Sequence, residues 1–427
     1  MAKGLVMRKS IQYLAGALIS VGISGHAFST SSSKADRRIT ALQWFKDKKM
    51  ELAIELYQNL ALSSANENIA LSPYSISKSL TMLLAGAESK TKSEIFDTLN
   101  LGQTFTEDMV HDLASQLIAE IENREQRAYS LEAASAIWSD DQLTLNDDFQ
   151  SILAQYYQTP ARTLDFSWSP ESSRQQINQW ASDQTAGHIK ELLPEGSINQ
   201  DTKLVATDAL FYKGAWLFPF SDKLLTYDIF YKADGNESPA TFMNIRAEYP
   251  YYSDDNFEAL ALPIIAKDQQ SSYEQVMIFA QPKDPTRSLA DLEAQMSSDL
   301  LKAMWQKHRK THVDFSLPKF KFRSQNPLKN ALSEMGMTLA FDPYRADFSG
   351  VFEYPVEGLY LTDVYHQAYI DVNEKGLEAS AATAAVAGCT SAPIEVLQMT
   401  LNRPFMFYIY DIPSQSVMFM GRVHNPS

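Results

Sequence analysis

Apolar residues recur at helical spacing through the first third of the chain, after about residue 44. Intervals of three and four residues place such side chains on one face of a helix. The pattern therefore predicts three helices, with their apolar faces at Leu52, Leu56 and Leu60, at Ile76, Leu80, Leu83 and Leu84, and at Val110, Leu113, Leu117 and Ile121.

The second half of the chain contains strand patterns. In "HVDFSLPKFKF", Val313, Phe315 and Leu317 alternate with polar residues, which predicts a half-buried strand. The segments "PFMFYIYDI" and "SVMFMGRV" are apolar on both faces and are separated by "PSQS". They predict a buried antiparallel hairpin. The sequence therefore indicates a mixed α and β fold.

The alanine-rich stretch "EKGLEASAATAAVAGCTS", residues 374–391, fits two patterns. Alanine favours a helix, but Leu377 and Val386 are its only large apolar side chains and would anchor a helix poorly. At a period of two, one face is free of charge. The stretch is therefore either a surface helix or a loop able to become a strand. The uncharged face of such a strand would comprise Leu377, Ala379, Ala381, Thr383, Ala385 and Ala387.

Composition narrows the class of protein. The 427 residues are 45% hydrophobic and 11% aromatic, so the chain can bury a large core and is not a disordered protein. No repeat or shift in composition follows Trp44, which favours one domain. The formal net charge of −15 argues against nonspecific binding of nucleic acid or heparin.

The N-terminus has the features of a signal peptide. A basic start precedes an apolar run, Ile11 to Ile23, that is short for a membrane span, and Gly25 and Ala27 suit a signal peptidase. We predict a signal peptide of bacterial proportions at 1–27, a polar tether at 28–43 and a folded domain at 44–427; an uncleaved membrane anchor is the alternative. The protein is expected to be secreted or periplasmic. Its single cysteine, Cys389, allows no internal disulfide.

The sequence offers little catalytic chemistry. Among seven histidines, only His308 and His312 have a spacing that could bind a metal, and they straddle the start of a predicted strand. Nucleophile-elbow, Walker and dinucleotide-binding motifs do not occur in the sequence. We therefore predict no enzymatic activity, no metal and no cofactor.

Eight segments, in order, resemble the serpin family of protease inhibitors from about Trp44 to the C-terminus. They are "NIALSPYSISKSLTMLLAGAESKTKSEI", "INQWASDQTAGHIKELLP", "TKLVATDALFYKGAWLFPF", "LPKFKF", "ADFSGV", "VYHQAYIDVNEKG", "NRPFMF" and "MFMGRVHNP". The resemblance implies an α+β fold in one domain, with three β-sheets, about nine helices and an exposed reactive-centre loop at about 374–403. In an inhibitory serpin, a protease cleaves this loop, becomes covalently trapped, and is carried along as the loop inserts into the main sheet.

The resemblance makes the alanine-rich stretch the hinge of this loop. An inserting strand must lack proline, and its inward side chains should be uncharged and small. Residues 376–392 contain no proline, and Glu378 would point outward. The hinge therefore looks inhibitory, although Leu377 is larger than the Thr, Ser or Val usual in the family. The hinge residues are Glu374, Gly376, Leu377, Glu378, Ala379, Ser380, Ala381, Ala382 and Thr383.

The family's usual hinge length implies a reactive bond between Thr390 and Ser391. Cleavage at Cys389–Thr390 or Ser391–Ala392 stays open, because the spacing from Gly376 to Pro404 matches the family's longer loops. A small residue before the bond suits an elastase-like or subtilisin-like serine protease. Cys389, beside the bond, is either a small filler or a site of redox control.

Other family positions also have counterparts. The polar cluster beneath the main sheet, called the shutter, corresponds to Ser72, Ser75, Asp208 and His366, and the region called the breach corresponds to Trp216. The family normally has Asn at position 208. An Asp would favour a protonated His366, so we expect either pH-dependent insertion or a histidine with a purely structural role.

The resemblance implies a monomer whose partner is a target serine protease. The segment that matches the family's heparin-binding helix, "TEDMVHDLASQLIAEIENREQ", is acidic, so heparin binding is not expected. The alternatives are a noninhibitory serpin that acts as a binding or storage protein, and an inhibitor of cysteine proteases.

Overall fold

The computed structural model describes residues 34–124, 129–266, 273–377 and 396–427. Contacts divide the chain into two units, Met1–Thr40 and Ala41–Ser427. The described part of the first unit is helical. The second unit contains both sheets and the site, and the paragraphs below concern that unit.

Nine α-helices lie in the described residues: α1 (Lys34–Ser63), α2 (Pro73–Leu84), α3 (Ser89–Thr98), α4 (Glu107–Glu122), α5 (Asp147–Tyr157), α6 (Pro170–Gln184), α7 (Leu289–Gln295), α8 (Ser298–Gln306) and α9 (Lys329–Glu334). Three 3-10 helices accompany them: η1 (Gly102–Thr104), η2 (Asp222–Leu224) and η3 (Leu339–Phe341). The predicted apolar faces of α1, α2 and α4 are buried, which confirms those three helices.

The strands of the described residues are β1 (Ile69–Leu71), β2 (Ser130–Asp140), β3 (Arg162–Leu164), β4 (Leu204–Ala215), β5 (Thr226–Tyr231), β6 (Glu237–Ser253), β7 (Phe257–Ile265), β8 (Tyr273–Pro282), β9 (Arg309–Pro318), β10 (Phe320–Pro327), β11 (Leu361–Asn373), β12 (Gly376–Leu377), β13 (Leu397–Thr400), β14 (Phe405–Asp411) and β15 (Ser416–Val423). Val313, Phe315 and Leu317 of β9 are buried as predicted, and β14 and β15 form the predicted buried antiparallel hairpin.

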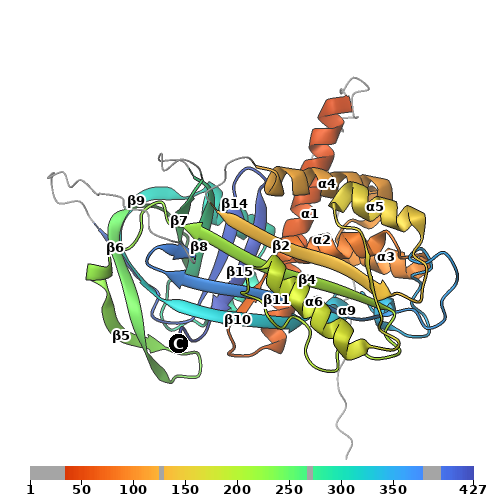
Figure 1. Ribbon diagram of the computed structural model, residues 1–427. Coiled ribbons are helices and arrows are strands. Elements are labelled where there is room, and N and C mark those ends of the chain that lie inside the picture. Colours follow the sequence, from red (N-terminus) through yellow and green to blue (C-terminus); the bar gives the residue numbers. More distant parts are fainter. Residues whose placement is uncertain (1–33, 125–128, 267–272, 378–395) are drawn as a thin grey trace, which may run out of the picture. The chain divides into compact units, whose positions relative to one another are not determined.

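The six-stranded sheet has the strand order β10-β11-β12-β4-β2-β3. Helix α6 lies over one face of this sheet (Figure 1). There Ile177 and Ala181 meet apolar side chains of β2 and β4. Helix α2, buried along its whole length, packs between this sheet and β15. The sheet is therefore covered on both faces.

The other strands form a single nine-stranded sheet, with the order β1-β15-β14-β8-β7-β6-β9-β13 and β5 paired to β6. The α+β fold class agrees with prediction, but two of the three expected sheets are hydrogen-bonded to each other. The cause is the 17-residue strand β6, which pairs with β9 along Phe242–Tyr251 and with β7 at Tyr251–Ser253.

Helix α1 starts earlier than the sequence pattern suggested. It begins at Lys34, inside the segment 28–43 predicted to be a polar tether. Its first residues include alanine and arginine, which favour helix even without an apolar stripe. Among the described helices, none combines the length and apolar character needed to cross a bilayer.

Candidate functional site

Two residues of the predicted hinge are already seated in the six-stranded sheet. Gly376 and Leu377 form β12, which lies between the ends of β11 and β4. Leu377 pairs with Val372 on β11 and with Gly214 on β4. Its side chain is only 2% exposed and belongs to the main apolar core. This end of the sheet therefore includes two residues of the predicted hinge as a short strand.

Gly376 is required by the close approach of β4. Its φ of +145° lies in a region that favours glycine, and a Cβ at this position would lie 2.2 Å from the carbonyl oxygen of Gly214. That neighbour is backbone and cannot easily move. Only glycine therefore fits where the chain turns from β11 into β12.

Trp216 and Glu374 fix the turn that precedes β12. The Trp216 side chain donates its Nε1–H to the carbonyl of Asn373 (2.9 Å), and its backbone N–H donates to the carbonyl of Lys375 (3.1 Å). The buried Glu374 carboxylate pairs with Lys319. The structure thus brings Trp216 and the described hinge residues together at one end of the sheet.

Below β12, β4 and β11 pair directly with each other, and we call this parallel pairing the seam. It runs from Leu204–Leu361 to Phe211–Tyr369, with an irregularity near its start. In Figure 1 the two strands lie next to each other, with β10 and β2 on either side. A strand that extended β12 further would have to separate the seam.

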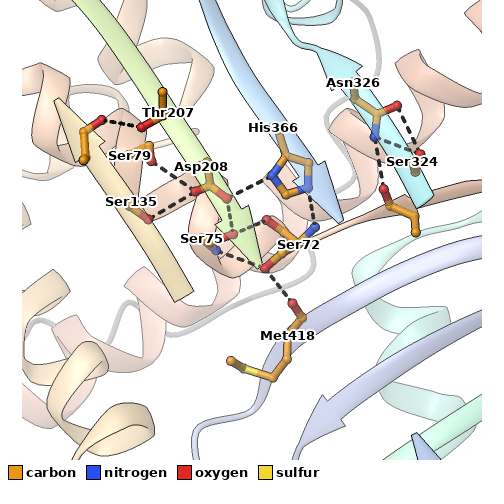
Figure 2. A network of polar contacts seen from close by, with 12 residues as sticks. Ser72, Ser75, Ser79, Ser135, Thr207, Asp208, Ser324, Asn326, His366 and Met418 are labelled. Atoms are coloured by element: carbon orange, nitrogen blue, oxygen red, sulfur yellow. Dashed lines mark hydrogen bonds and ion pairs between the residues drawn. The ribbon is translucent and has the colours of Figure 1, made fainter. Parts of the chain in front are cut away.

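The four predicted shutter residues meet in one hydrogen-bonded cluster beneath the seam (Figure 2). The Asp208 carboxylate accepts hydrogen bonds from Ser75 Oγ (2.6 Å), Ser79 Oγ (3.1 Å) and Ser135 Oγ (3.2 Å). It also contacts Nδ1 of His366 at 2.9 Å. Asp208 and His366 are register partners on β4 and β11, so their contact crosses the seam.

The hydrogen bonds of His366 define its tautomer. The backbone N–H of Ser72 lies 3.1 Å from Nε2, which must therefore accept. Nδ1 then carries the proton and donates to Asp208. A proton on Nε2 would break the bond from Ser72. The sequence contained Asp208 but gave no sign of that backbone donor.

Sequence reasoning missed two side chains of the cluster, Ser79 and Ser135. Ser79 lies four residues after Ser75 on α2, so helical spacing could have placed both hydroxyls on one face. Ser135 becomes a neighbour only through the pairing of β2 with β4, which local patterns do not reveal. Ser72 Oγ donates to the carbonyl of Met418 (2.8 Å), and this bond links the cluster to β15.

The other predicted site residues lie outside the described residues. These are Glu378, Ala379, Ser380, Ala381, Ala382 and Thr383 of the hinge, and Cys389, Thr390 and Ser391 at the reactive bond. His308 contacts Trp305, and His312 lies 3.8 Å from Glu248. The described part of the chain contains no group of three or more side chains arranged to hold a metal ion.

Comparison with known proteins identifies the family. Residues 47–426 match the family model described as "Serpin (serine protease inhibitor)". The chain is 32% identical to antithrombin-III of Mus musculus over 381 residues, covering 88% of this chain and 80% of the relative. It is also 32% identical to the leukocyte elastase inhibitor of Xenopus tropicalis over 383 residues, covering 88% and 97%.

A solved structure shows the same fold. The complex of thyroxine-binding globulin with thyroxine superimposes with a TM-score of 0.78 at 27% identity, covering 90% of this chain and 99% of that one. The chain therefore belongs to the serpin family of protease inhibitors, and its fold is shared by this thyroxine-binding globulin.

Proposed function

We propose that the protein is an irreversible protease inhibitor that acts by cleavage of its loop and insertion of the loop into the six-stranded sheet. The serine Oγ of the target attacks the carbonyl carbon of Thr390, and the Thr390–Ser391 bond breaks. The amino group of Ser391 leaves with a proton, and an ester joins the protease to Thr390. The protein is thus a substrate that traps the enzyme and has no catalytic activity of its own.

The observation that carries this proposal is the position of β12. Leu377 is buried in line with the seam, so continued insertion needs only that β4 and β11 separate further. If about a dozen residues each gained a net 1 kcal/mol from backbone hydrogen bonds, insertion would release on the order of 10 kcal/mol. An energy of that size is enough to distort a protease active site.

The expected target is an elastase-like or subtilisin-like serine protease. Thr390 is small, and the segment between 376 and 402 contains no Arg or Lys for a trypsin-like pocket. The Xenopus relative is named as an inhibitor of leukocyte elastase. We further propose a secreted or periplasmic monomer that binds neither nucleic acid nor heparin, since α4 carries Glu107, Asp108, Asp112, Glu120 and Glu122.

The test is to mix the protein lacking residues 1–27 with elastase, subtilisin, trypsin and papain. Denaturing gels should show a covalent complex with elastase or subtilisin and release of the peptide 391–427. Mass spectrometry of that peptide locates the bond, since a start at Thr390 or Ala392 would mark the neighbouring sites. A complex with papain instead would indicate inhibition of cysteine proteases.

A second readout follows insertion itself. Protein cleaved in the loop should unfold at a higher temperature than intact protein, because the added strand gains hydrogen bonds and packing. Cleavage with neither a complex nor a rise in melting temperature would refute the inhibitor proposal and leave a noninhibitory serpin.

A specific feature supports a second candidate function, that of a carrier. A pocket of about 1010 Å³ lies between α1, α7, the segment before β14 and the residues after β15. His424 lines it and is 7% exposed, and neither of its ring nitrogens has a hydrogen-bond partner. Burial, and then the charge of Arg422, lower the pKa of His424 to about 4. Arg403, whose Nε also lacks a partner, lines the same pocket.

These groups suit a ligand with an anionic end and an apolar body, which could also contact Leu62 and Leu289 in the pocket. The solved globulin relative carries such a compound, thyroxine. Anilinonaphthalene sulfonate, an amphipathic anion, should bind with a fluorescence increase, and His424→Phe should weaken binding about fivefold. Equal affinity in His424→Phe and the parent would remove the carrier candidate, and His308→Phe serves as the control.

A further inference from the structure

The imidazole of His188 lies across the seam. Its ring centroid is 4.1 Å from that of Phe211, with planes 7° apart, and 5.2 Å from that of Tyr369, with planes 29° apart. Phe211 and Tyr369 are register partners on β4 and β11. Asp208 lies three residues before Phe211 and so faces the opposite side of the sheet. One ring therefore stacks on a side chain from each strand of the seam, on the face away from the polar cluster.

A short, well-bonded turn holds His188 in this position. Thr185 caps the C-terminal end of α6, and its hydroxyl donates to the carbonyl of Ala181 (2.7 Å) and accepts from the N–H of Ile189 (3.1 Å). Gly187, with φ of +80°, reverses the chain, and the N–H of His188 donates to the carbonyl of Thr185 (2.9 Å). Ile189 is fully buried in the same apolar cluster as Phe211 and Tyr369. The ring therefore belongs to a fixed turn.

Side chains of a third strand, β10, also contact the ring of Tyr369. Lys321 and Arg323 of β10 approach its ring, with Nζ at 5.7 Å and Cζ at 5.6 Å from the centroid. Such cations stabilise an aromatic ring in place. Phe211 and Tyr369 are both almost fully buried. The two rings are thus fixed platforms on either side of the seam.

Separation of the seam must break this stack. Neighbouring strands lie about 4.8 Å apart, so a strand entering between β4 and β11 would move them to about 10 Å. The centroids of Phe211 and Tyr369 are now 6.3 Å apart, and one imidazole could not stay on both after that movement. In the register of β12, the third residue to enter after Leu377 would lie between these two rings. The stack is therefore lost early in insertion.

We propose that His188 is a positioning residue that clasps β4 to β11 and limits the rate at which the six-stranded sheet opens. The role of His188 in inhibition rests on the proposed function. The stack of His188 on Phe211 and Tyr369, however, is present in the intact protein. Sheet opening can therefore be measured without any protease, so failure of the clasp and failure of the inhibitor proposal are distinguishable.

The experiment is amide hydrogen exchange of the intact chain at pH 7, followed in peptides that contain Phe211 and Tyr369. His188→Ala should speed exchange in both peptides about fivefold, whereas peptides from β14 should keep the parental rate. His188→Phe retains an aromatic ring and should restore slow exchange. His188→Gln, a second variant without an aromatic ring, should behave as His188→Ala does.

Unchanged exchange at the seam in both His188→Ala and His188→Gln would overturn the proposal. So would an equal rise in β14, which would indicate general loss of stability, or a failure of His188→Phe to restore protection. The matched control is His308→Ala, whose imidazole lies 4.7 Å from the ring of Trp305 at the end of α8. This control should leave exchange at the seam unaltered.

Discussion

Two buried ionisable side chains, Asp208 and Lys49, differ in what surrounds them. Asp208 is fully buried, and its carboxylate accepts hydrogen bonds from three serines and one histidine. These bonds offset the cost of removing a carboxylate from water. Lys49 on α1 is 8% exposed, and its Nζ has no hydrogen-bond partner and lies 4.6 Å from the centroid of Phe45. The cost of burial is therefore largely uncompensated at Lys49.

Burial lowers the pKa of Lys49 from 10.5 to about 7. The unfolded chain therefore binds the proton more tightly, and this residue makes stability rise with pH between about 7 and 10.5. At and below pH 7 the penalty is close to its full size. We expect Lys49→Met to raise the free energy of unfolding by about 1–3 kcal/mol at pH 6, with a gain that shrinks towards pH 10.

Urea unfolding of the intact chain at pH 6, 8 and 10 measures this effect. Lys48→Met, one position earlier on α1, removes an amine that pairs with Glu51 near the surface and should change the midpoint little. A gain for Lys49→Met that stayed constant from pH 6 to pH 10 would contradict the assignment to a buried amine.

At the residue scale, the sequence showed some members of the site and not others. Ser72, Ser75, Asp208 and His366 stood in recognisable family segments, and the structure brings them together. Ser135 carries no such signal, because an isolated serine in a strand has no distinctive pattern. The role of His188 was equally unreadable, since stacking across the seam depends on the pairing of two strands far apart in sequence.

At the scale of elements, β12 is the shortest strand in the described part of the chain, and the proposed insertion would start there. The position of β12 between β11 and β4 buries the apolar side chain of Leu377 and leaves no space for a Cβ at Gly376. Burying an unpaired carboxylate at position 377 would cost several kcal/mol. Leu377→Glu should therefore abolish the covalent complex with elastase while leaving the rate of loop cleavage within about twofold.

The control for this change is Lys375→Glu, which adds an acid in the exposed turn two residues earlier. It should retain complex formation, and Leu377→Val, which keeps position 377 apolar, should do so as well. Gels that resolve complex from cleaved protein give the fraction of each. If Leu377→Glu trapped elastase as well as the parent does, β12 would not be the start of insertion.

Several elements were predicted from periodicity, and the failures have identifiable causes. The strand at Val313 and the hairpin of β14 and β15 were confirmed because their burial follows simple local patterns. The early start of α1 was missed because helix propensity acts there without an apolar stripe. The continuity of the nine-stranded sheet was missed because it depends on three pairs at the end of β6.

At the scale of the whole molecule, the six-stranded sheet is bridged across the seam on both faces. Asp208 and His366 bridge it from one side, and His188 does so from the other. These contacts favour the direct pairing of β4 with β11, and under the proposed function β12 would be the point from which the sheet expands. The fold could be predicted because the family segments span almost the whole chain. The contacts across the seam and the pairing of β12 could not be predicted from the sequence, because they join residues that are brought together only by the folded structure.

The pairing of β4 with β11 has a consequence for how the chain reaches this state. Asp208 and His366, which face each other across the seam, are 158 residues apart, and contacts between such distant residues form slowly during folding. Gly376 is only three residues from the end of β11 and pairs with the same edge of that strand, just beyond the residues that pair with β4. The chain therefore reaches the described arrangement only if β4 pairs with β11 along this edge. We therefore expect the pairing of β4 with β11 to be a late step in folding.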